Sequence, residues 1–302
     1  MERLTLRLHL YLAVAGALLP MALVAAAAAL MLVQEEARVI EREVLGRARA
    51  AMSAVDAHLA ASTDALETLA ASRELEAGDI RAFHAESQRV LRTQPAWVNV
   101  GLATTDRIAL SNAIYAFGKP EPLAPADEPS FVAAARDGRP GIGNVAAGTV
   151  VRNPTARLRV PVVQGEEVRY VLSAPLNLKY FADLLQAQEL PAGWAIGLVD
   201  RERQIVARLP PAAAGIPVSD AMREALARAA QGWFRSRTME GAPSYTAYVT
   251  SPLSGWVLAI AVPERAVEGE ARRAYVLVGA GIAAALAAGL LIAWFASRRI
   301  QR

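Results

Sequence analysis

The chain has 302 residues, no cysteine and a formal net charge of +3. Without cysteine it can form neither disulfides nor thiolate metal sites. The basic excess lies at the two ends of the chain, in Arg3, Arg7, Arg298, Arg299 and Arg302. Residues 34–273 carry 27 basic and 28 acidic side chains, and the three histidines have no metal-binding spacing. We therefore expect no nucleic-acid partner, no metal and no cofactor.

Two uncharged apolar runs, residues 10–33 and 274–296, stand near the ends of the chain. Each exceeds the roughly 20 residues that an α-helix needs to cross ~30 Å of hydrocarbon, so we predict two transmembrane helices. Because Lys and Arg are enriched on cytoplasmic flanks, tails 1–9 and 297–302 are predicted to be cytoplasmic. Residues 34–273 would then lie outside the plasma (inner) membrane. A cleaved signal peptide is the alternative for the first run, although such peptides have an apolar core of only ~7–15 residues.

Apolar side chains recur at helical spacing from Ile40 to Leu69 and form one narrow stripe. A helix over residues 34 to about 72 would measure roughly 55–60 Å at ~1.5 Å per residue. Such a helix packs along a domain or against a copy of itself, and the second use predicts a homodimer. A shorter helix is expected over residues 79–91, so residues 34–94 form a helical stalk.

Residues 95–190 show strand patterns interrupted by a short helix. The predicted strands cover 97–103, 107–111, 142–147, 158–163 and 168–175, and the predicted helix covers 130–136. A proline-rich loop over residues 118–129 can form neither a regular helix nor a central strand. These elements predict one mixed lobe with an antiparallel sheet.

The same order of elements returns in residues 191–263, after a predicted helix over 178–188. The strands expected here cover 194–200, 204–209, 232–238, 244–250 and 256–262, with a helix at 220–231. A repeated order of elements indicates internal duplication, with a shorter second copy. A connecting helix, residues 264–273, would lead into the second apolar run.

Several segments together resemble one family. Residues 197–208, Gly-Leu-Val-Asp-Arg-Glu-Arg-Gln-Ile-Val-Ala-Arg, resemble the apolar-Val-Asp-turn-apolar hairpin of double Cache domains. These are extracytoplasmic relatives of PAS domains in bacterial transmembrane receptors such as histidine kinases, diguanylate cyclases and chemoreceptors. Residues 127–134 and 137–140 are similar to the family's short helix and turn, and residues 160–163 and 254–263 fit its late strands.

This resemblance implies an α+β fold with two tandem PAS-like (Cache) lobes on a long N-terminal helix, bracketed by the two transmembrane helices. Residues 95–190 would be the membrane-distal lobe, and residues 191–263 the membrane-proximal lobe. A ligand pocket is implied in the distal lobe, between the sheet and the helix and loop that cover it. Family members that bind amino acids carry Arg, Trp and Tyr at the start of the short helix, whereas this chain has Glu128, Ser130 and Phe131. That departure argues against α-amino acids as ligands.

The candidate ligand-binding residues combine cations with neutral hydrogen-bonding groups. Arg157 and Arg159 occupy alternate positions of a predicted strand and so point to one face, where guanidinium groups would suit a carboxylate. The alternative is that both arginines face solvent. The full candidate set is Asn112, Tyr115, Phe131, Arg157, Arg159 and Tyr170.

We find no phosphate-binding loop and no nucleophile elbow, so we do not expect an enzyme. We predict a membrane-anchored extracytoplasmic sensor that binds a small molecule and passes the signal to a two-component kinase or cyclic-dinucleotide output. Only six residues follow the second apolar run, so the output module would be fused beyond Arg302 or act in trans. The alternatives are an envelope adaptor or structural protein that binds another protein, and an envelope hydrolase, for which the sequence offers no candidate residues.

Overall fold

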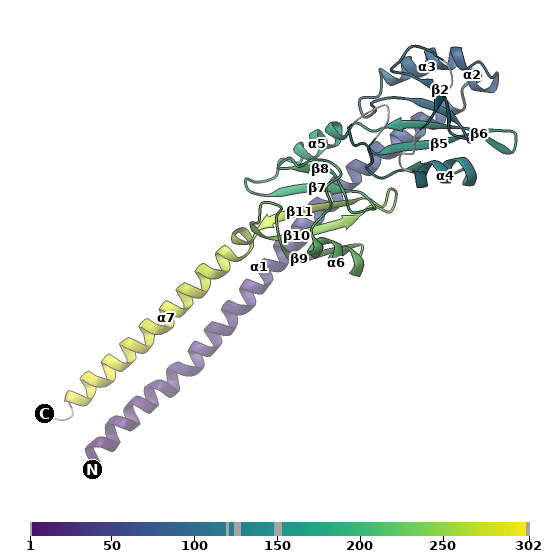
Figure 1. The fold of residues 1–302 in the computed structure, drawn as a ribbon. Coiled ribbons are helices and arrows are strands. Elements are labelled where there is room, and N and C mark those ends of the chain that lie inside the picture. Colours follow the sequence, from purple (N-terminus) through teal and green to yellow (C-terminus); the bar gives the residue numbers. More distant parts are fainter. Residues whose placement is uncertain (1, 119–120, 124–127, 148–152, 300–302) are drawn as a thin grey trace. The chain divides into compact units, whose positions relative to one another are not determined.

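The structure is a computed structural model with two compact units (Figure 1). One unit, Val44–Val262, contains both predicted lobes, and the other contains Met1–Glu43 and Pro263–Arg302. The structure describes residues 2–118, 121–123, 128–147 and 153–299. The last three residues of the predicted C-terminal tail, and residue 1, lie outside the described part.

The smaller unit is helical. It contains the first part of α1 (Glu2–Ala70) and all of the described length of α7 (Glu264–Arg299). Within the described residues, no helix has both the length and the apolar character that a membrane crossing requires.

The first lobe contains a six-stranded antiparallel sheet in the order β3-β2-β1-β6-β5-β4. Its strands are β1 (Gly101–Thr104), β2 (Ile108–Asn112), β3 (Glu121–Pro122), β4 (Gly141–Ile142), β5 (Arg157–Gln164) and β6 (Glu167–Pro175). Its helices are α2 (Arg73–Glu76), α3 (Ile80–Leu91) and α4 (Glu128–Asp137). Asp79 caps α3 by accepting the Ala82 N–H. The β5–β6 hairpin turns at Gly165, whose φ of 67° suits a residue without a Cβ.

The second lobe contains a five-stranded antiparallel sheet in the order β8-β7-β11-β10-β9. Its strands are β7 (Ala195–Val199), β8 (Ile205–Leu209), β9 (Gln231–Arg237), β10 (Pro243–Thr250) and β11 (Val257–Pro263). Helix α5 (Leu178–Gln186) precedes the sheet, and α6 (Asp220–Arg228) packs on it. The long N-terminal helix and the two antiparallel sheets confirm the predicted α+β class.

Two predicted strands lose the most residues in the structure. The first begins at Gly101, because Trp97 makes only an isolated bridge to Leu176. The strand predicted at 142–147 ends at Ile142, and beyond it Ala146 makes only an isolated bridge to Thr155, while the Val145 N–H between them donates to a carboxylate of the second lobe. Within the described part of the proline-rich loop, β3 is a two-residue edge strand on β2, where proline is tolerated. Residues 119–120 and 124–127 of that loop lie outside the described part.

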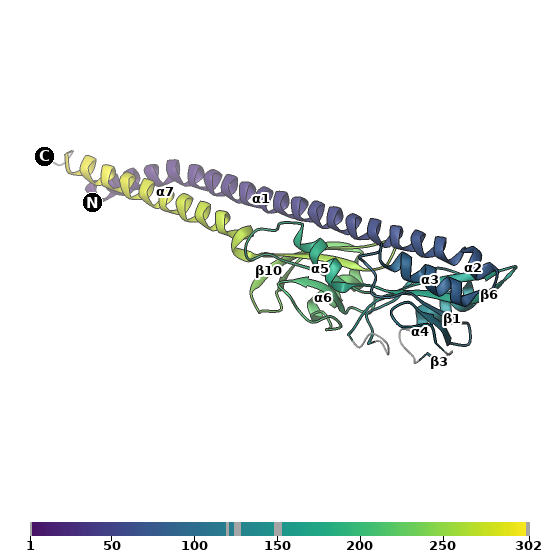
Figure 2. The same ribbon diagram turned by 90° about the horizontal axis from the view of Figure 1, so that it is seen from above.

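Helix α1 buries its apolar stripe within the chain. Its fully buried residues from Val44 onward are Val44, Ala48, Val55, Leu59 and Leu66, each 0% exposed. Polar contacts link the same helix to the second lobe, where Ser251 Oγ donates to Asp56 Oδ1 at 2.7 Å and the hydroxyl of Tyr180 lies 2.9 Å from His58 Nδ1. From Val44 onward, α1 runs along both lobes (Figure 2). The stripe therefore packs along the domain, so it provides no support for the homodimer, which stays a prediction.

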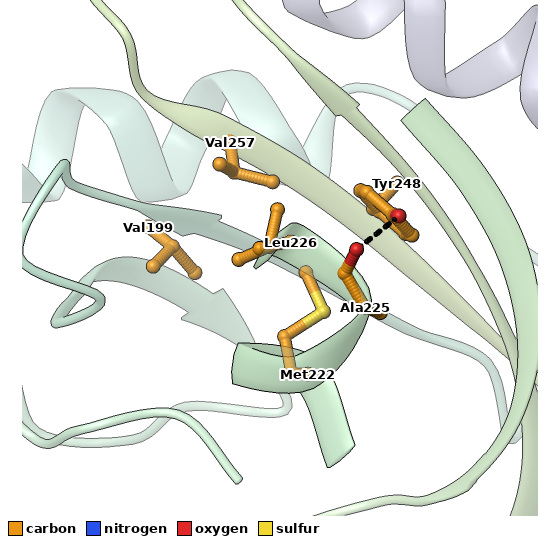
Figure 3. Packing of buried hydrophobic residues seen from close by; sticks show 6 residues of the cluster. All are labelled: Val199, Met222, Ala225, Leu226, Tyr248 and Val257. Carbon is orange, nitrogen blue, oxygen red and sulfur yellow. Dashed lines mark hydrogen bonds between the residues drawn. The ribbon is translucent and has the colours of Figure 1, made fainter. Parts of the chain in front are cut away.

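The core of the second lobe forms between α6 and one face of the sheet (Figure 3). It consists of Val199, Met222, Ala225, Leu226, Tyr248 and Val257. The Tyr248 hydroxyl donates to the Ala225 carbonyl at 2.8 Å, which satisfies the only polar atom of that side chain. Since burying a large apolar side chain stabilises a fold by ~1.5–3 kcal/mol, this cluster fixes α6 on the sheet.

Candidate functional site

A cavity of about 530 Å³ lies on one face of the first lobe's sheet. Its volume falls in the range of about 300–1,000 Å³ that is typical of small-molecule sites. Strands β1, β2, β5 and β6 contribute to its wall, together with α4 and residues that follow β2. Five of the six candidate residues line it: Asn112, Tyr115, Phe131, Arg157 and Arg159.

Both candidate arginines of β5 are buried in this wall. Arg157 is 8% exposed and Arg159 is 4% exposed, so the alternative of solvent-facing arginines is wrong. Arg159 Nε donates to Ser130 Oγ at 2.8 Å, and its Nη1 donates to Ser173 Oγ at 3.1 Å. The second bond follows from the strand register, because Arg159 is directly opposite Ser173 in the β5–β6 pair.

The ring of Phe131 contacts two arginine side chains of the cavity. It is 3% exposed and packs in a cluster with Ala103, Ala134 and Val171. The guanidinium carbon of Arg159 lies 5.1 Å from the centre of the Phe131 ring. The corresponding distance for Arg107 is 5.4 Å. Both distances are within the ~6 Å of a cation–π interaction, so this aromatic side chain holds two guanidinium groups beside one cavity.

Arg107 is a site residue that the sequence analysis missed. It lies between β1 and β2 with φ of 68°, a conformation that is uncommon for a residue other than glycine. Its carbonyl accepts the Leu123 N–H at 2.8 Å, and this bond connects the turn to residues 121–123 of the proline-rich loop. The sequence pattern predicted Arg107 as the first residue of a strand. Only its position directly after the Thr-Thr-Asp turn could have indicated that it belongs to the turn and lines the cavity.

The charged side chains in the described lining of the cavity are mainly cationic. It carries three arginines, Arg107, Arg157 and Arg159, and one carboxylate, the exposed Glu121. Charges in a concave, partly desolvated site interact more strongly than charges on an open surface. Among the described residues, the Asn112 Oδ1 atom is buried without a hydrogen-bond partner, so it can accept a hydrogen bond from a donor group of a ligand. This arrangement suits an anion that also carries a donor group.

Tyr170 is the candidate residue that does not line the cavity in the described structure. Side chains alternate between the two faces of a strand, and on β6 Ser173 and Pro175 face the cavity. Tyr170 stands at an even-numbered position and therefore points to the opposite face, where it is 8% exposed. Its ring lies beside the Arg169 guanidinium, at 5.6 Å.

A buried carboxylate joins the two lobes. Asp200, at the end of β7, is 0% exposed. Its Oδ2 accepts the Val145 N–H of the first lobe at 2.8 Å, and its Oδ1 accepts the Gln204 N–H at 2.9 Å. Burial raises the pKa of the Asp200 carboxyl above its ordinary value, and these N–H donors oppose that effect.

Further contacts surround this joint. Asn144 Nδ2 donates to Glu202 Oε1 at 3.0 Å, and Arg201 donates to the Ile142 carbonyl. The Gly143 N–H, within the same first-lobe segment, donates to the carbonyl of Arg157 at 2.7 Å. A continuous set of hydrogen bonds therefore connects a cavity-lining strand of the first lobe to the β7–β8 turn of the second.

Neither the protein-family models nor the curated proteins contain a match to this chain. Solved structures do match. The extracellular domain of rpHK1S-Z16, described as a histidine kinase, is 14% identical, with a TM-score of 0.59 over 79% of this chain and 97% of that domain. The ligand-binding domain of the Campylobacter jejuni chemoreceptor Tlp3, in complex with L-valine, is 11% identical, with a TM-score of 0.56 over 78% of this chain and 97% of that chain.

A third structure, the sensor domain of the V. cholerae histidine kinase DctB, is 12% identical, with a TM-score of 0.50 over 74% of this chain and 98% of that chain. The first is an extracellular domain of a histidine kinase, the other two are a ligand-binding domain and a sensor domain, and this chain shares their fold. The predicted resemblance to Cache-type sensor domains is confirmed at the level of the fold.

Proposed function

We propose that this protein is a membrane-anchored sensor whose first lobe binds a small carboxylate-bearing molecule outside the cytoplasm. The cavity with two buried arginines is the observation that carries this proposal. A guanidinium group offers paired donors that match a carboxylate, and a partly desolvated site strengthens the interaction. An adaptor that binds another protein would need an exposed apolar surface, and the concave cationic cavity favours the sensor over that alternative.

The membrane part of the proposal is supported by the two apolar runs of the sequence and their arginine flanks. Because the chain lacks cysteine, single-cysteine variants can test the topology. A membrane-impermeant maleimide should label Ala50→Cys in cells whose inner membrane is intact. The same reagent should label Ser297→Cys only after that membrane is broken. Equal labelling of both variants in intact cells would contradict two spans with cytoplasmic ends.

For the signal path, we propose that ligand binding shifts the population between two arrangements of the Asp200 joint and, through it, of the second lobe. Strand β7 pairs with β11, which continues directly into α7. The output would be a kinase or cyclic-dinucleotide module, fused beyond Arg302 or acting in trans. The chain itself would act as a homodimeric input region and not as an enzyme.

Isothermal titration of the full chain in lipid nanodiscs tests ligand binding. The panel comprises mono-, di- and tricarboxylates, α-amino acids, and uncharged polyols as negative controls. We expect heat from at least one carboxylate. Loss of one charge-assisted hydrogen bond is worth ~1.5–3 kcal/mol, so Arg159→Gln should weaken that binding by about 10- to 150-fold.

Two further variants separate the role of the site from general effects. Arg159→Lys keeps the charge but removes the planar fork, and it should bind between the wild type and Arg159→Gln. Arg136→Gln changes an exposed arginine at the end of α4 and should bind as the wild type does. No heat from any carboxylate, or full binding by Arg159→Gln, would refute the carboxylate site.

A further inference from the structure

The second lobe has a cavity of its own, of about 130 Å³, which the proposed function does not use. It lies between the sheet, α6 and the turn that joins β9 to β10. We propose that this cavity is a second ligand site, which takes a small uncharged apolar molecule about the size of one aromatic ring.

The wall of this cavity is mainly apolar. Its apolar side chains are Ala195, Val199, Ile205, Val218, Met222, Phe234, Met239, Ala259 and Ala261. An apolar protein cavity of ~150 Å³ stays dry and takes up benzene, so the size and lining here suit a ligand of that kind. The cavity is partly open to solvent, so an apolar occupant would displace water from a wall whose accessible surface is mainly apolar.

Arg208, a buried cation in the described wall of this cavity, already has a counter-ion. The Arg208 side chain is 8% exposed, and its Nη1 and Nη2 atoms donate to Glu240 Oε1 and Oε2 at 2.7 and 2.9 Å. Its Nη1 also donates to the Pro210 carbonyl at 2.8 Å. These bonds from Arg208 lower the pKa of Glu240 to about 2, so the pair stays ionised near neutral pH. An anionic ligand would have to displace Glu240 and leave that carboxylate without its partner, which disfavours anions.

The hydroxyl groups near the cavity are likewise bound within the chain. Ser236 Oγ lies 2.7 Å from Thr246 Oγ1 and 3.0 Å from Ser244 Oγ. Ser219 Oγ, at the start of α6, accepts the Met222 N–H at 3.4 Å. A neutral ligand leaves all of these bonds intact, whereas a strongly polar ligand would compete with them. Arg237, an exposed cation on the same wall, donates to the Gly241 carbonyl at 2.8 Å, so the polar groups described here already have partners within the chain and an uncharged occupant is favoured.

The cavity adjoins the core cluster of this lobe. Val199 and Met222 belong to both, and Figure 3 shows them on the sheet and on α6. An occupant would therefore contact the residues that position α6. Met222 and Met239 also place two methyl groups on the wall, which are sensitive reporters of an aromatic ring nearby.

The test uses the full chain in lipid nanodiscs, with ¹³C-labelled methionine methyl groups observed by NMR. Toluene, benzoate and benzylammonium are titrated separately. We expect toluene to shift the Met222 and Met239 signals in a saturable way. Met52 is buried on α1 and does not line the cavity, so its signal should not follow the same curve. Met31 is 71% exposed and controls for toluene that dissolves in the lipid.

Variants that fill the cavity complete the test. Ala261→Leu should reduce toluene binding by at least 10-fold, and Ala50→Leu, at an exposed position of α1, should bind as the wild type does. If Ala261→Leu does not fold, the smaller substitution Ala259→Val fills part of the same cavity and should also weaken toluene binding. The absence of saturable shifts in the wild type, undiminished binding by the filled variant, or tighter binding of benzoate than of toluene would each overturn the proposal. Carboxylate binding in the first lobe should be unaffected by all of these changes.

Discussion

The ion pair between Arg208 and Glu240 leads to the most quantitative prediction. Arg208 lies on β8 with its side chain 8% exposed, whereas Glu240 follows β9 and its side chain is 51% exposed. The hydrogen bonds from Arg208 are the main reason why the pKa of Glu240 falls from its ordinary value of 4.5 to about 2. The substitution Glu240→Gln removes the charge with little change of shape.

The size of the effect follows from that pKa difference. At ~1.36 kcal/mol per pKa unit, the drop to about 2 corresponds to about 3 kcal/mol of stability. Because half of the Glu240 side chain is in water, solvent screening reduces this to about 1.5 kcal/mol. We therefore expect Glu240→Gln to lower the free energy of unfolding by about 1.5 kcal/mol at pH 7.

The stabilisation by this ion pair should decrease as the pH falls. The native pKa is lower than the unfolded pKa, so the stabilisation is present above about 4.5 and is lost as the pH falls towards 2. Urea unfolding of the second lobe, followed by tryptophan fluorescence at several pH values, measures this. The difference between wild type and variant should shrink below pH 4.5. Glu67→Gln, at an exposed position of α1, is the matched control and should leave stability unchanged. A variant as stable as the wild type at pH 7, or a difference that does not change with pH, would refute the reasoning.

Three further substitutions test the packing and the joint by the same unfolding assay. Leu59→Ala removes a fully buried side chain of α1 and should lower the free energy of unfolding by about 2–5 kcal/mol; an effect below 1 kcal/mol would contradict burial within the chain. Asp200→Asn replaces one carboxylate oxygen with an NH₂ group, which cannot accept a hydrogen bond from the backbone N–H that faces it. This variant should lower the free energy of unfolding by about 1–3 kcal/mol and accelerate amide hydrogen exchange at Val145 or Gln204. Unchanged exchange at both amides would argue against the joint. Tyr248→Phe removes the bond to the Ala225 carbonyl and should lower stability by about 0.5–1.5 kcal/mol, whereas a more stable variant would show that this bond contributes nothing.

Periodicity and turn residues predicted most elements of this chain in the correct order, whereas α2 and β3 were not predicted. The helix predicted from residue 34 to about 72 ends at Ala70, and the strand predicted at 244–250 spans Pro243–Thr250. These signals are local, because a helix or a strand repeats its side-chain directions every few residues. Of the strand predicted at 142–147, only Ile142 belongs to a regular strand, and the Val145 N–H instead donates to Asp200, which lies 55 residues away in the sequence and which local periodicity cannot predict.

The candidate site shows the same division. Alternation along one strand correctly predicted that Arg157 and Arg159 share a face, because it depends only on the pleat of that strand. The register between β5 and β6 places Arg159 opposite Ser173, so Ser173 and the residues that alternate with it on β6 face the cavity. Tyr170 is on the other face of β6, and periodicity along the chain could not predict this. Arg107 reaches the cavity because its turn folds back beside Phe131.

The sequence by itself determined the fold class, the helix that carries the apolar stripe, and the strand that carries two cations. Only the tertiary structure decided that the stripe packs inside the chain, that Phe131 holds two guanidinium groups, and that Glu240 neutralises Arg208. The physical reason is that periodicity along the chain records where side chains point relative to their neighbours in sequence. Contacts between distant residues arise only from strand register and from the packing of helices on sheets.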